Sequence, residues 1–147
     1  MEKINQIDSK SNLFLFYPDN KNEIYPPNFS FSISESEISN KLCGISRKDH
    51  FAGVCTIVYL LLSFIRPDKA YFGQKDYQQY LIIKKMVNDL NIACKIILGK
   101  TIRNKNNLAL SSRNHNLSPQ EIKHSSKLFN QINKLSKLLI TNTTHQL

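Results

Sequence analysis

The stretch that decides the fold is Ala70–Leu90, which reads AYFGQKDYQQYLIIKKMVNDL. Its first three residues are apolar and lead into Gly73, which predicts a short strand followed by a turn. Residues 76–90 have the spacing of an amphipathic helix, with Leu81, Ile82, Met86 and Leu90 available for the buried face. A strand, a glycine turn and a helix in this order are typical of an α/β sheet whose parallel strands are joined by helices.

The chain before this stretch is predicted to contain one long helix and two further strands. Residues 50–64 carry apolar side chains at three- and four-residue spacings, which indicates a helix that ends before Pro67. The apolar run at residues 13–17 predicts a buried strand, and the alternation of apolar residues with serine at 29–33 predicts another. Residues 44–49 are mostly polar and are predicted to form a loop.

The chain after this stretch is predicted to hold a strand at residues 93–98, a mostly irregular segment at 101–112 and a final helix. Ser118, Pro119 and Glu121 have the arrangement of a capping box at the start of that helix. Its apolar face comprises Ile122, Leu128, Phe129, Ile132, Leu135 and Leu139. Because the α/β pattern stops near Gly99, we expect one region over residues 1–99 and a second over residues 100–147.

The overall composition is that of one globular domain, or of one domain and part of another. The chain has 147 residues, and 41% of them are hydrophobic, which is enough for a packed core. It has no run of 18 apolar residues and no secretory signal pattern, so we expect neither a membrane span nor secretion. The three cysteines show no Cys-x-x-Cys spacing, which indicates neither a zinc site nor a disulfide framework. These features favour a cytoplasmic protein with reduced thiols.

The net charge is strongly positive, and it has two readings. The chain carries 20 Lys and Arg against 11 Asp and Glu, a formal net charge of +9. The functional reading is an anionic partner, such as a nucleotide, pyrophosphate or nucleic acid. The other reading is a general compositional excess of Lys, Asn and Ile. The lysines are scattered and form no stripe, which favours the compositional reading.

Residues 73–79 place a glycine, a lysine, an aspartate and amides at the predicted carboxyl end of a strand, where α/β proteins bind ligands. Gly73 lets a ligand approach the backbone, and the amides that open the next helix favour anions. Lys75 can neutralise phosphate oxygens, and Asp76 can accept from a ribose hydroxyl or hold Mg²⁺ through water. Gln79 can donate to a carboxylate. The alternative is an ordinary helix start with Asp76 as its cap.

A second motif, Ser111-Ser112-Arg113, combines two hydroxyls with one guanidinium. Such a loop can surround a phosphate, because Arg113 can bind two of its oxygens at once. The alternative is a polar turn that precedes the capped helix. The tripeptide alone is a weak signal, and the residues on either side make it more specific.

Together the two motifs resemble those of the pantothenate synthetase (pantoate–β-alanine ligase) family, which has FG(E/Q)KDYQQL followed by GLAMSSRN. Residues 72–79 match the first motif, and residues 108–114 match the second with Leu110 in place of Met. Asn107 stands where the family has a glycine, and asparagine tolerates a left-handed backbone. Residues 47–54 keep the arginine, the His-Phe pair and the Gly-Val pair of the family segment RPGHFxGVxTVV. The resemblance covers roughly residues 10–140.

The resemblance implies an α/β fold with a partial Rossmann-like parallel sheet and flanking helices, followed by the start of a small C-terminal α+β domain. It implies ATP-dependent condensation of pantoate with β-alanine through pantoyl adenylate, with release of AMP and pyrophosphate. Mg²⁺ is carried with ATP, with no direct metal ligand on the chain. A homodimer is also implied, and no membrane or nucleic-acid partner is expected.

The resemblance also assigns site residues. The residues matched to ATP binding are Gly73, Gln74, Lys75, Asp76, Ile102, Leu110, Ser111, Ser112 and Arg113, and the catalytic candidates among them are Lys75, Ser111, Ser112 and Arg113. Gln79 is matched to pantoate binding. Arg47 and His50 either border the acid-binding pocket or only begin a helix. Val58 and Phe72 match pocket-wall positions, which in most proteins are core.

One part of the family pattern has no counterpart in this sequence. The family carries a His-x-Gly-His motif in an N-terminal nucleotide-binding half, and none of the four histidines here has that spacing. We therefore interpret the chain as the C-terminal portion of such an enzyme, in a truncated form. The alternatives are a non-catalytic fragment or subunit that needs a separate N-terminal half, and a basic nucleic-acid-binding domain.

Overall fold

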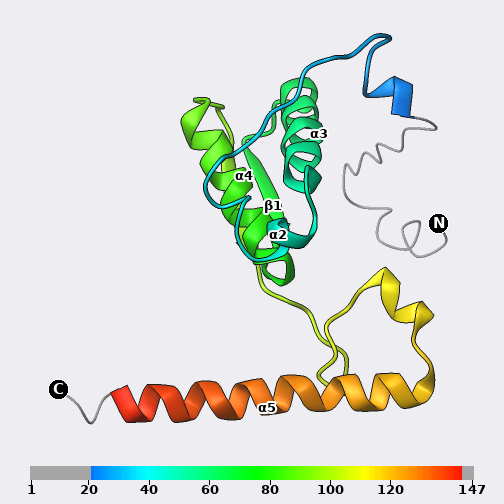
Figure 1. The fold of residues 1–147 in the computed structure, drawn as a ribbon, viewed down its shortest axis with the longest axis vertical. Helices are drawn as coiled ribbons and strands as arrows, with labels where there is room; N and C mark the ends of the chain where they lie inside the picture. Colours follow the sequence, from blue (N-terminus) through cyan, green and yellow to red (C-terminus); the bar gives the residue numbers. More distant parts are fainter. Residues whose placement is uncertain (1–20, 144–147) are drawn as a thin grey trace, which may run out of the picture.

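The computed structural model describes residues 21–143. Its elements in chain order are η1 (Lys21–Glu23), α2 (Cys43–Ser46), α3 (His50–Ile65), β1 (Lys69–Gly73), η2 (Gln74–Asp76), α4 (Tyr77–Asp89), β2 (Lys95–Gly99), η3 (Ser112–Asn116) and α5 (Pro119–Thr143) (Figure 1). The predictions of an α/β class and of helices and strands at α3, β1, α4 and β2 are confirmed.

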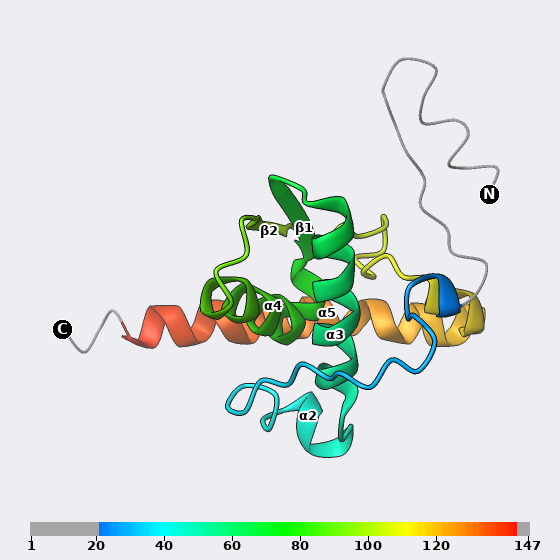
Figure 2. The ribbon, with the colours of Figure 1, turned by 90° about the horizontal axis from the view of Figure 1, so that it is seen from above.

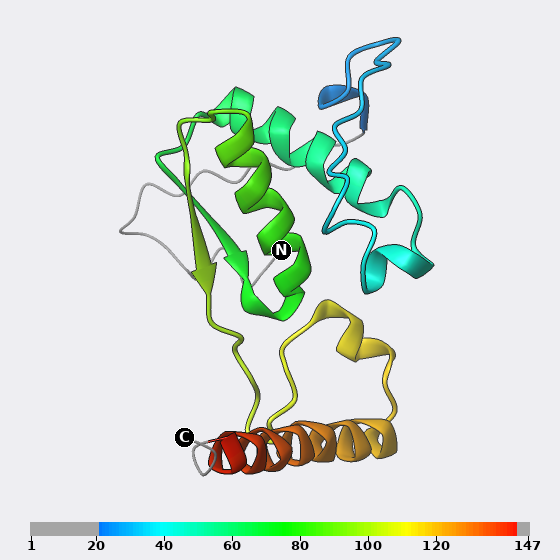
Figure 3. The ribbon, with the colours of Figure 1, turned by 60° about the vertical axis from the view of Figure 1, so that its left-hand side comes forward.

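The sheet has two parallel strands in the described part of the chain. β1 pairs with β2 in a register that sets Lys69 opposite Lys95 and Gly73 opposite Gly99, and α4 connects the two strands. Both α3 and α4 lie on one side of this sheet (Figures 2 and 3). Alternate residues of β1 therefore face the helices, and Tyr71, which faces away, is 70% exposed.

The core forms where α3, α4 and the inner face of the sheet meet. Its buried side chains are Phe51, Cys55 and Leu62 from α3 and Ile82, Ile83, Met86 and Val87 from α4. Ala70, Phe72 and Ile96 pack against them from the strands. The three- and four-residue spacing that predicted the helices is therefore the spacing of the side chains that they bury. The end of β1 and the start of α4 are fixed by this core.

Two predictions before α3 are wrong, and a third lies outside the described residues. Residues 29–33 alternate as a strand would, but no strand lies beside them within residues 21–143, and the amide of Ile33 donates instead to Oγ1 of Thr56 at 2.9 Å. An extended segment without a neighbouring strand cannot form a ladder. The predicted loop at 44–49 contains most of α2. The strand predicted at 13–17 lies outside residues 21–143.

After β2 the chain leaves the sheet and forms a loop that is attached to α5. Arg103 and Ala109 form an antiparallel bridge, and the Arg103 guanidinium lies 3.7 Å from the ring centroid of Phe129 on α5. Nδ2 of Asn107 donates to Oδ1 of Asn130 at 3.1 Å. Asn107 has φ 64°, which is the left-handed backbone that asparagine tolerates.

Helix α5 begins as predicted and leaves much of its apolar face exposed. The hydroxyl and amide of Ser118 each donate to Glu121 at 2.8 Å, and the amide of Glu121 donates back to Oγ of Ser118 at 3.3 Å. Exposed apolar residues on this helix include Leu128, Ile132, Leu135 and Leu138. The side chain of Leu139 lies outside the description. No helix within residues 21–143 is long and apolar enough to cross a membrane.

Candidate functional site

A pocket of about 260 Å³ opens where β1 ends and α4 begins. Its lining residues come from α2 and the residues beside it, from the start of α3, from η2 and from the start of α4. They are Leu42, Cys43, Arg47, His50, Phe51, Lys75, Asp76, Tyr77, Gln78 and Gln79. We call this the motif pocket. It brings together five of the residues that the sequence singled out, namely Arg47, His50, Lys75, Asp76 and Gln79.

Gly73 marks the carboxyl end of β1 beside this pocket. Its φ is −71°, which any residue can adopt, and an added Cβ would meet no atom of the described chain within 4 Å. The backbone of this protein therefore does not require a glycine here. The open space in front of Gly73 is available to a bound molecule. Gln74, the next residue, is exposed in the first turn of η2.

The charged groups of the motif pocket give it a positive balance. Nη2 of Arg47 lies 3.2 Å from Nδ1 of His50. Since a guanidinium can only donate, Nδ1 of His50 accepts, and the neutral ring carries its proton on Nε2. Lys75 and Asp76 are exposed and have no ion pair within residues 21–143. Two permanent cations therefore share this pocket with one carboxylate, which favours an anionic ligand.

Two adjacent glutamines differ in what their side chains contact. Gln79 is half-buried, and its side chain makes no hydrogen bond to any residue in the described range. Its side-chain amide is therefore available to a ligand. The amide of Gln78 makes hydrogen bonds to the backbone of residues 38, 41 and 43. No sequence pattern signals this role of Gln78, because its partners lie 35 to 40 residues away along the chain.

Two of the residues matched to the pocket wall lie elsewhere. Val58 on α3 and Phe72 on β1 are partly buried and pack against the core, and neither lines the motif pocket. Their side chains face the layer between the sheet and the helices. The core reading of these two positions, which the sequence left open, therefore describes them in this structure.

The second motif lies on a separate segment. Oγ of Ser111 accepts from the amide of Arg113 at 3.3 Å, which starts η3, and the side chains of Ser112 and Arg113 are exposed. This segment does not line the motif pocket. Figures 1 and 3 show η3 on the side of the α/β unit where β1 ends and α4 begins. Within residues 21–143, Arg113 has no ion pair that would occupy its guanidinium.

The other two residues matched to ATP binding lie at the base of this segment. The amide of Leu110 donates to the carbonyl oxygen of Ile102 at 2.9 Å, so the two residues are held side by side. Ile102 is 65% exposed and Leu110 is 55% exposed. They present an apolar surface next to the serines, in keeping with contact with a flat base.

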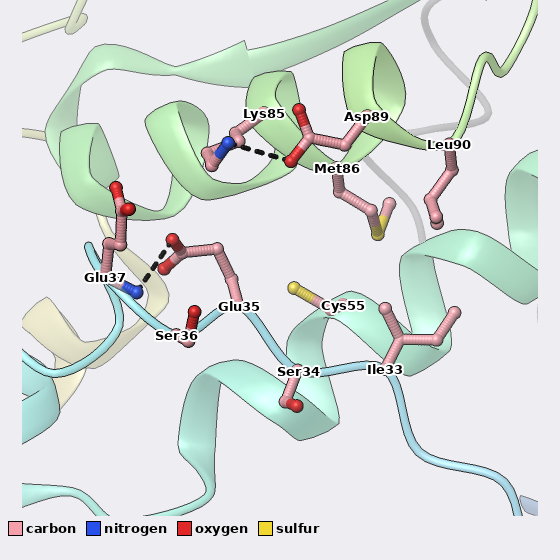
Figure 4. A pocket seen from close by; sticks show the side chains of 10 residues that line it. All are labelled: Ile33, Ser34, Glu35, Ser36, Glu37, Cys55, Lys85, Met86, Asp89 and Leu90. Carbon is pink, nitrogen blue, oxygen red and sulfur yellow. Dashed lines mark hydrogen bonds and ion pairs between the residues drawn. The ribbon is translucent and has the colours of Figure 1, made fainter.

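A neighbouring cavity of about 240 Å³ shows how the chain leading to the pocket is held (Figure 4). The carboxylate of Glu35 accepts from the amides of Glu37 at 2.9 Å and Ser39 at 2.7 Å. Partial burial opposes ionisation of Glu35, but these backbone hydrogen bonds outweigh it and lower the pKa of the carboxyl. On α4, Lys85 and Asp89 form an ion pair at 2.8 Å.

Another titratable group in this cavity is the thiol of Cys55. It is fully buried on α3, and burial, with a smaller effect of the Glu35 charge, raises its pKa to about 11. The thiol therefore stays protonated at neutral pH and behaves as a small core residue. No group of three potential metal ligands among His, Cys, Asp and Glu occurs in the described part of the chain.

Comparison with known proteins connects this arrangement to one family. A family model described as pantoate-beta-alanine ligase matches residues 2–147. Pantothenate synthetase from Thermotoga petrophila is 39% identical over 141 residues, which make up 96% of this chain and 50% of the relative. The same enzyme from Ruminiclostridium cellulolyticum is 48% identical over 107 residues, or 73% of this chain and 38% of the relative.

Solved structures give the same result. Pantoate–β-alanine ligase from Thermus thermophilus matches with a TM-score of 0.71 at 39% identity, covering 74% of this chain and 40% of that one. The Francisella tularensis ligase, complexed with beta-gamma ATP and β-alanine, matches with a TM-score of 0.68 at 42% identity, covering 74% and 42%. The chain thus spans about half the length, or less, of the relatives that it matches. On the strength of this sequence-wide match, the chain belongs to the pantoate–β-alanine ligase family.

Proposed function

We propose that this chain carries part of the nucleotide- and acid-binding site of an enzyme that joins pantoate to β-alanine with ATP. The observation that carries the proposal is the motif pocket, in which Arg47, His50 and Gln79 lie with Lys75 and Asp76. A hydroxy acid and a polyphosphate are both anionic, and this pocket has a positive balance of fixed charge. Family membership supplies the identity of the two substrates.

The pocket residues suit the two steps of such a reaction. In the first, a carboxylate oxygen of pantoate attacks the α-phosphorus of ATP, the bond to the β-phosphate oxygen breaks, and pyrophosphate leaves. Gln79 and Arg47 would hold the acid by hydrogen bonds, and Lys75 would stabilise the charge that develops on the phosphates. In the second, the amine of β-alanine attacks the acyl carbon of pantoyl adenylate, loses a proton and displaces AMP.

Two further groups complete the proposed site. Ser111, Ser112 and Arg113 would close over the nucleotide, with the guanidinium on phosphate oxygens and Ile102 and Leu110 beside the base. Support comes from the exposed positions of Ser112, Arg113, Ile102 and Leu110, and from the absence of any ion pair to Arg113 within residues 21–143. Mg²⁺ bound to ATP would neutralise phosphate charge. Asp76 would hold this Mg²⁺ through water, because its exposed carboxylate has no partner in the described range.

The test is pantoate-dependent formation of AMP from ATP, followed by β-alanine-dependent formation of pantothenate. Lys75→Ala should lower AMP formation by roughly a hundredfold or more, because it removes a charge that the transition state needs. Lys127→Ala, on the exposed face of α5, is the matched control and should leave the rate unchanged. Equal rates for both variants would contradict the assignment of Lys75.

A second candidate function is that of a subunit that is active only with a separate polypeptide. It is favoured by the match to only about half of each relative, and by the exposed outer face of the sheet within residues 21–143, where Tyr71 is 70% exposed, since parallel sheets are normally covered on both faces. The test is to add the remaining half of a relative, such as the Thermotoga petrophila enzyme, to the purified chain. AMP formation that appears only in the mixture would support the subunit role, and equal activity of the chain alone would exclude it.

A further inference from the structure

We propose that Gln78 is a positioning residue that holds one wall of the motif pocket against the start of α4. The role of Gln78 in the fold rests on its hydrogen bonds, and the expected effect on acid binding rests on the proposed function. Nε2 of Gln78 donates to the carbonyl oxygens of Ile38 at 2.9 Å and Lys41 at 2.6 Å, and Oε1 accepts from the amide of Cys43 at 3.1 Å. We call these three hydrogen bonds the Gln78 clamp.

The clamp uses the whole donor capacity of the side chain. A primary amide has two N–H donors, and both are directed to backbone carbonyls, each of which also accepts a turn hydrogen bond from a backbone amide. The reverse orientation of the amide would set its oxygen against two carbonyl oxygens and its nitrogen against an N–H, so the network fixes the orientation. Gln78 therefore has no donor left for a substrate. This separates its role from that of Gln79, whose amide has no hydrogen bond to residues 21–143.

The clamped segment needs restraint because it contains an unusual backbone. Leu42 has φ 48° and ψ −117°, which are the angles of the first central residue of a type II′ turn. The amide of Gly44 closes this turn by donating to the carbonyl of Lys41 at 2.9 Å. Glycine is the usual residue at this position, and a leucine there is strained. The clamp bonds the peptide groups on both sides of Leu42, and so stabilises the conformation that Leu42 alone disfavours.

The clamped segment also determines where the pocket groups lie. Leu42 and Cys43 line the motif pocket themselves, and α2 leads directly from them to Arg47. The amide of His50 then donates to the carbonyl of Arg47 at 3.2 Å at the start of α3. A segment released from Gln78 would therefore let Arg47 move relative to Lys75 and Gln79. Loss of the clamp should weaken acid binding even though Gln78 does not contact the acid.

Two variants of Gln78 separate the parts of the clamp. Gln78→Leu removes all three hydrogen bonds, and the backbone amide of Cys43 should then exchange its hydrogen roughly tenfold faster or more. Gln78→Glu keeps the acceptor for Cys43 but directs a carboxylate at the carbonyls of Ile38 and Lys41. It should keep part of the Cys43 protection. Gln131→Leu on α5 is the matched control and should change neither reading. Exchange is measured by NMR on the full chain.

Titration of the same proteins with pantoate tests whether loss of the clamp weakens acid binding. We expect the dissociation constant of Gln78→Leu to rise by roughly fivefold or more, in a protein whose far-ultraviolet circular dichroism shows that it remains folded. Unchanged exchange at residues 38–43 would overturn the clamp, and faster exchange with unchanged affinity would overturn the positioning role. If the wild-type chain binds no pantoate, the proposed function fails for the chain alone, and the exchange result still decides the clamp.

Discussion

At the scale of single residues, the glycines distinguish a position where the fold leaves no room for a side chain from positions that are open to a ligand. An added Cβ at Gly44 would overlap the backbone carbonyl of Ser39, whereas the same atom at Gly73 or Gly53 would meet nothing within 4 Å. Gly44 is therefore required by the fold itself. Gly73 is open in this structure, so any requirement for glycine there comes from what binds. The sequence identified Gly73 through its motif, but it could not identify Gly44, because Ser39 approaches it only in the folded chain.

Gly44→Ala should lower the free energy of unfolding by about 1–3 kcal/mol, the usual effect of forcing an atom into filled space. The neighbour that it meets is backbone, which cannot rotate away. Gly53→Ala is the control: it lies inside α3 in open space and should raise the free energy of unfolding by about 0.5–1 kcal/mol. Urea denaturation measures both. A neutral result for Gly44→Ala would show that residues 39–44 relax more easily than the structure implies.

Gly73→Ala should change ligand binding and leave folding alone. The free energy of unfolding should stay within about 0.5 kcal/mol of the wild type, since the added methyl group touches no protein atom. The affinity for ATP should fall by roughly tenfold or more, because the methyl group fills space that we assign to the nucleotide. Calorimetric titration with ATP, on the chain alone or with a complementing half, measures this. An unchanged affinity would place the nucleotide elsewhere.

The raised pKa of Cys55 predicts a loss of stability in alkaline solution. The thiol has a pKa of about 11 in the folded protein against its ordinary value of 9.0, because it is buried. Between these values the unfolded chain loses the proton and the folded chain keeps it, so stability falls as the pH rises above 9.0, by at most about 1.4 kcal/mol per pH unit. The difference in melting temperature between wild type and Cys55→Ala should therefore shrink from about pH 8 to about pH 10. A constant difference would contradict this.

At the scale of elements, the sequence predicted best where local chemistry determines the structure. The start of α5 followed from Ser118 and Glu121, and both sides of the capping box are present. Helices α3 and α4 followed from their apolar spacing because that spacing is buried against a core. The alternation at residues 29–33 predicted a strand wrongly, since a strand also needs a neighbour. Phe31 in that segment is 81% exposed, and Ile33 bonds to a threonine side chain instead.

Ser118→Ala should destabilise the first turn of α5 by about 1 kcal/mol, because the hydroxyl accepts from the amide of Glu121. The expected result is lower helix content by circular dichroism on heating, and faster exchange of the amides of residues 120–122. Ser136→Ala, at an exposed position in the same helix, is the matched control. It should leave helicity unchanged or slightly higher, since alanine is the better helix former. Equal behaviour of both variants would argue against the cap.

At the scale of the whole molecule, the buried core of the described residues lies between α3, α4 and one face of the sheet formed by β1 and β2. The α/β class and the parallel pairing could be predicted from the order of elements. The positions of the two motifs relative to each other could not, because no local pattern fixes how residues 100–117 leave the sheet. Arg47, His50 and Gln79 line the motif pocket together, whereas Val58 and Phe72 pack against the core.

Because the core lies at α3 and α4 while the apolar residues of α5 are exposed, substitutions in α4 should cost more stability than substitutions in α5. Ile82→Ala on α4 should lower the free energy of unfolding by about 2–5 kcal/mol, because the side chain is fully buried in the core. Leu135→Ala on α5 should change it by less than about 0.5 kcal/mol, because that side chain is 60% exposed. Urea denaturation followed by far-ultraviolet circular dichroism compares them. A large effect of Leu135→Ala would reveal that another surface covers α5 in solution.

The attachment of the 103–109 loop to α5 has a mechanical consequence. Arg103 stacks on Phe129 and Asn107 bonds to Asn130, so the base of the Ser-Ser-Arg segment is fastened to the long helix at two points. A tilt of α5 would therefore carry this loop with it. A spectroscopic label on the far end of α5 should report such a tilt from a distance.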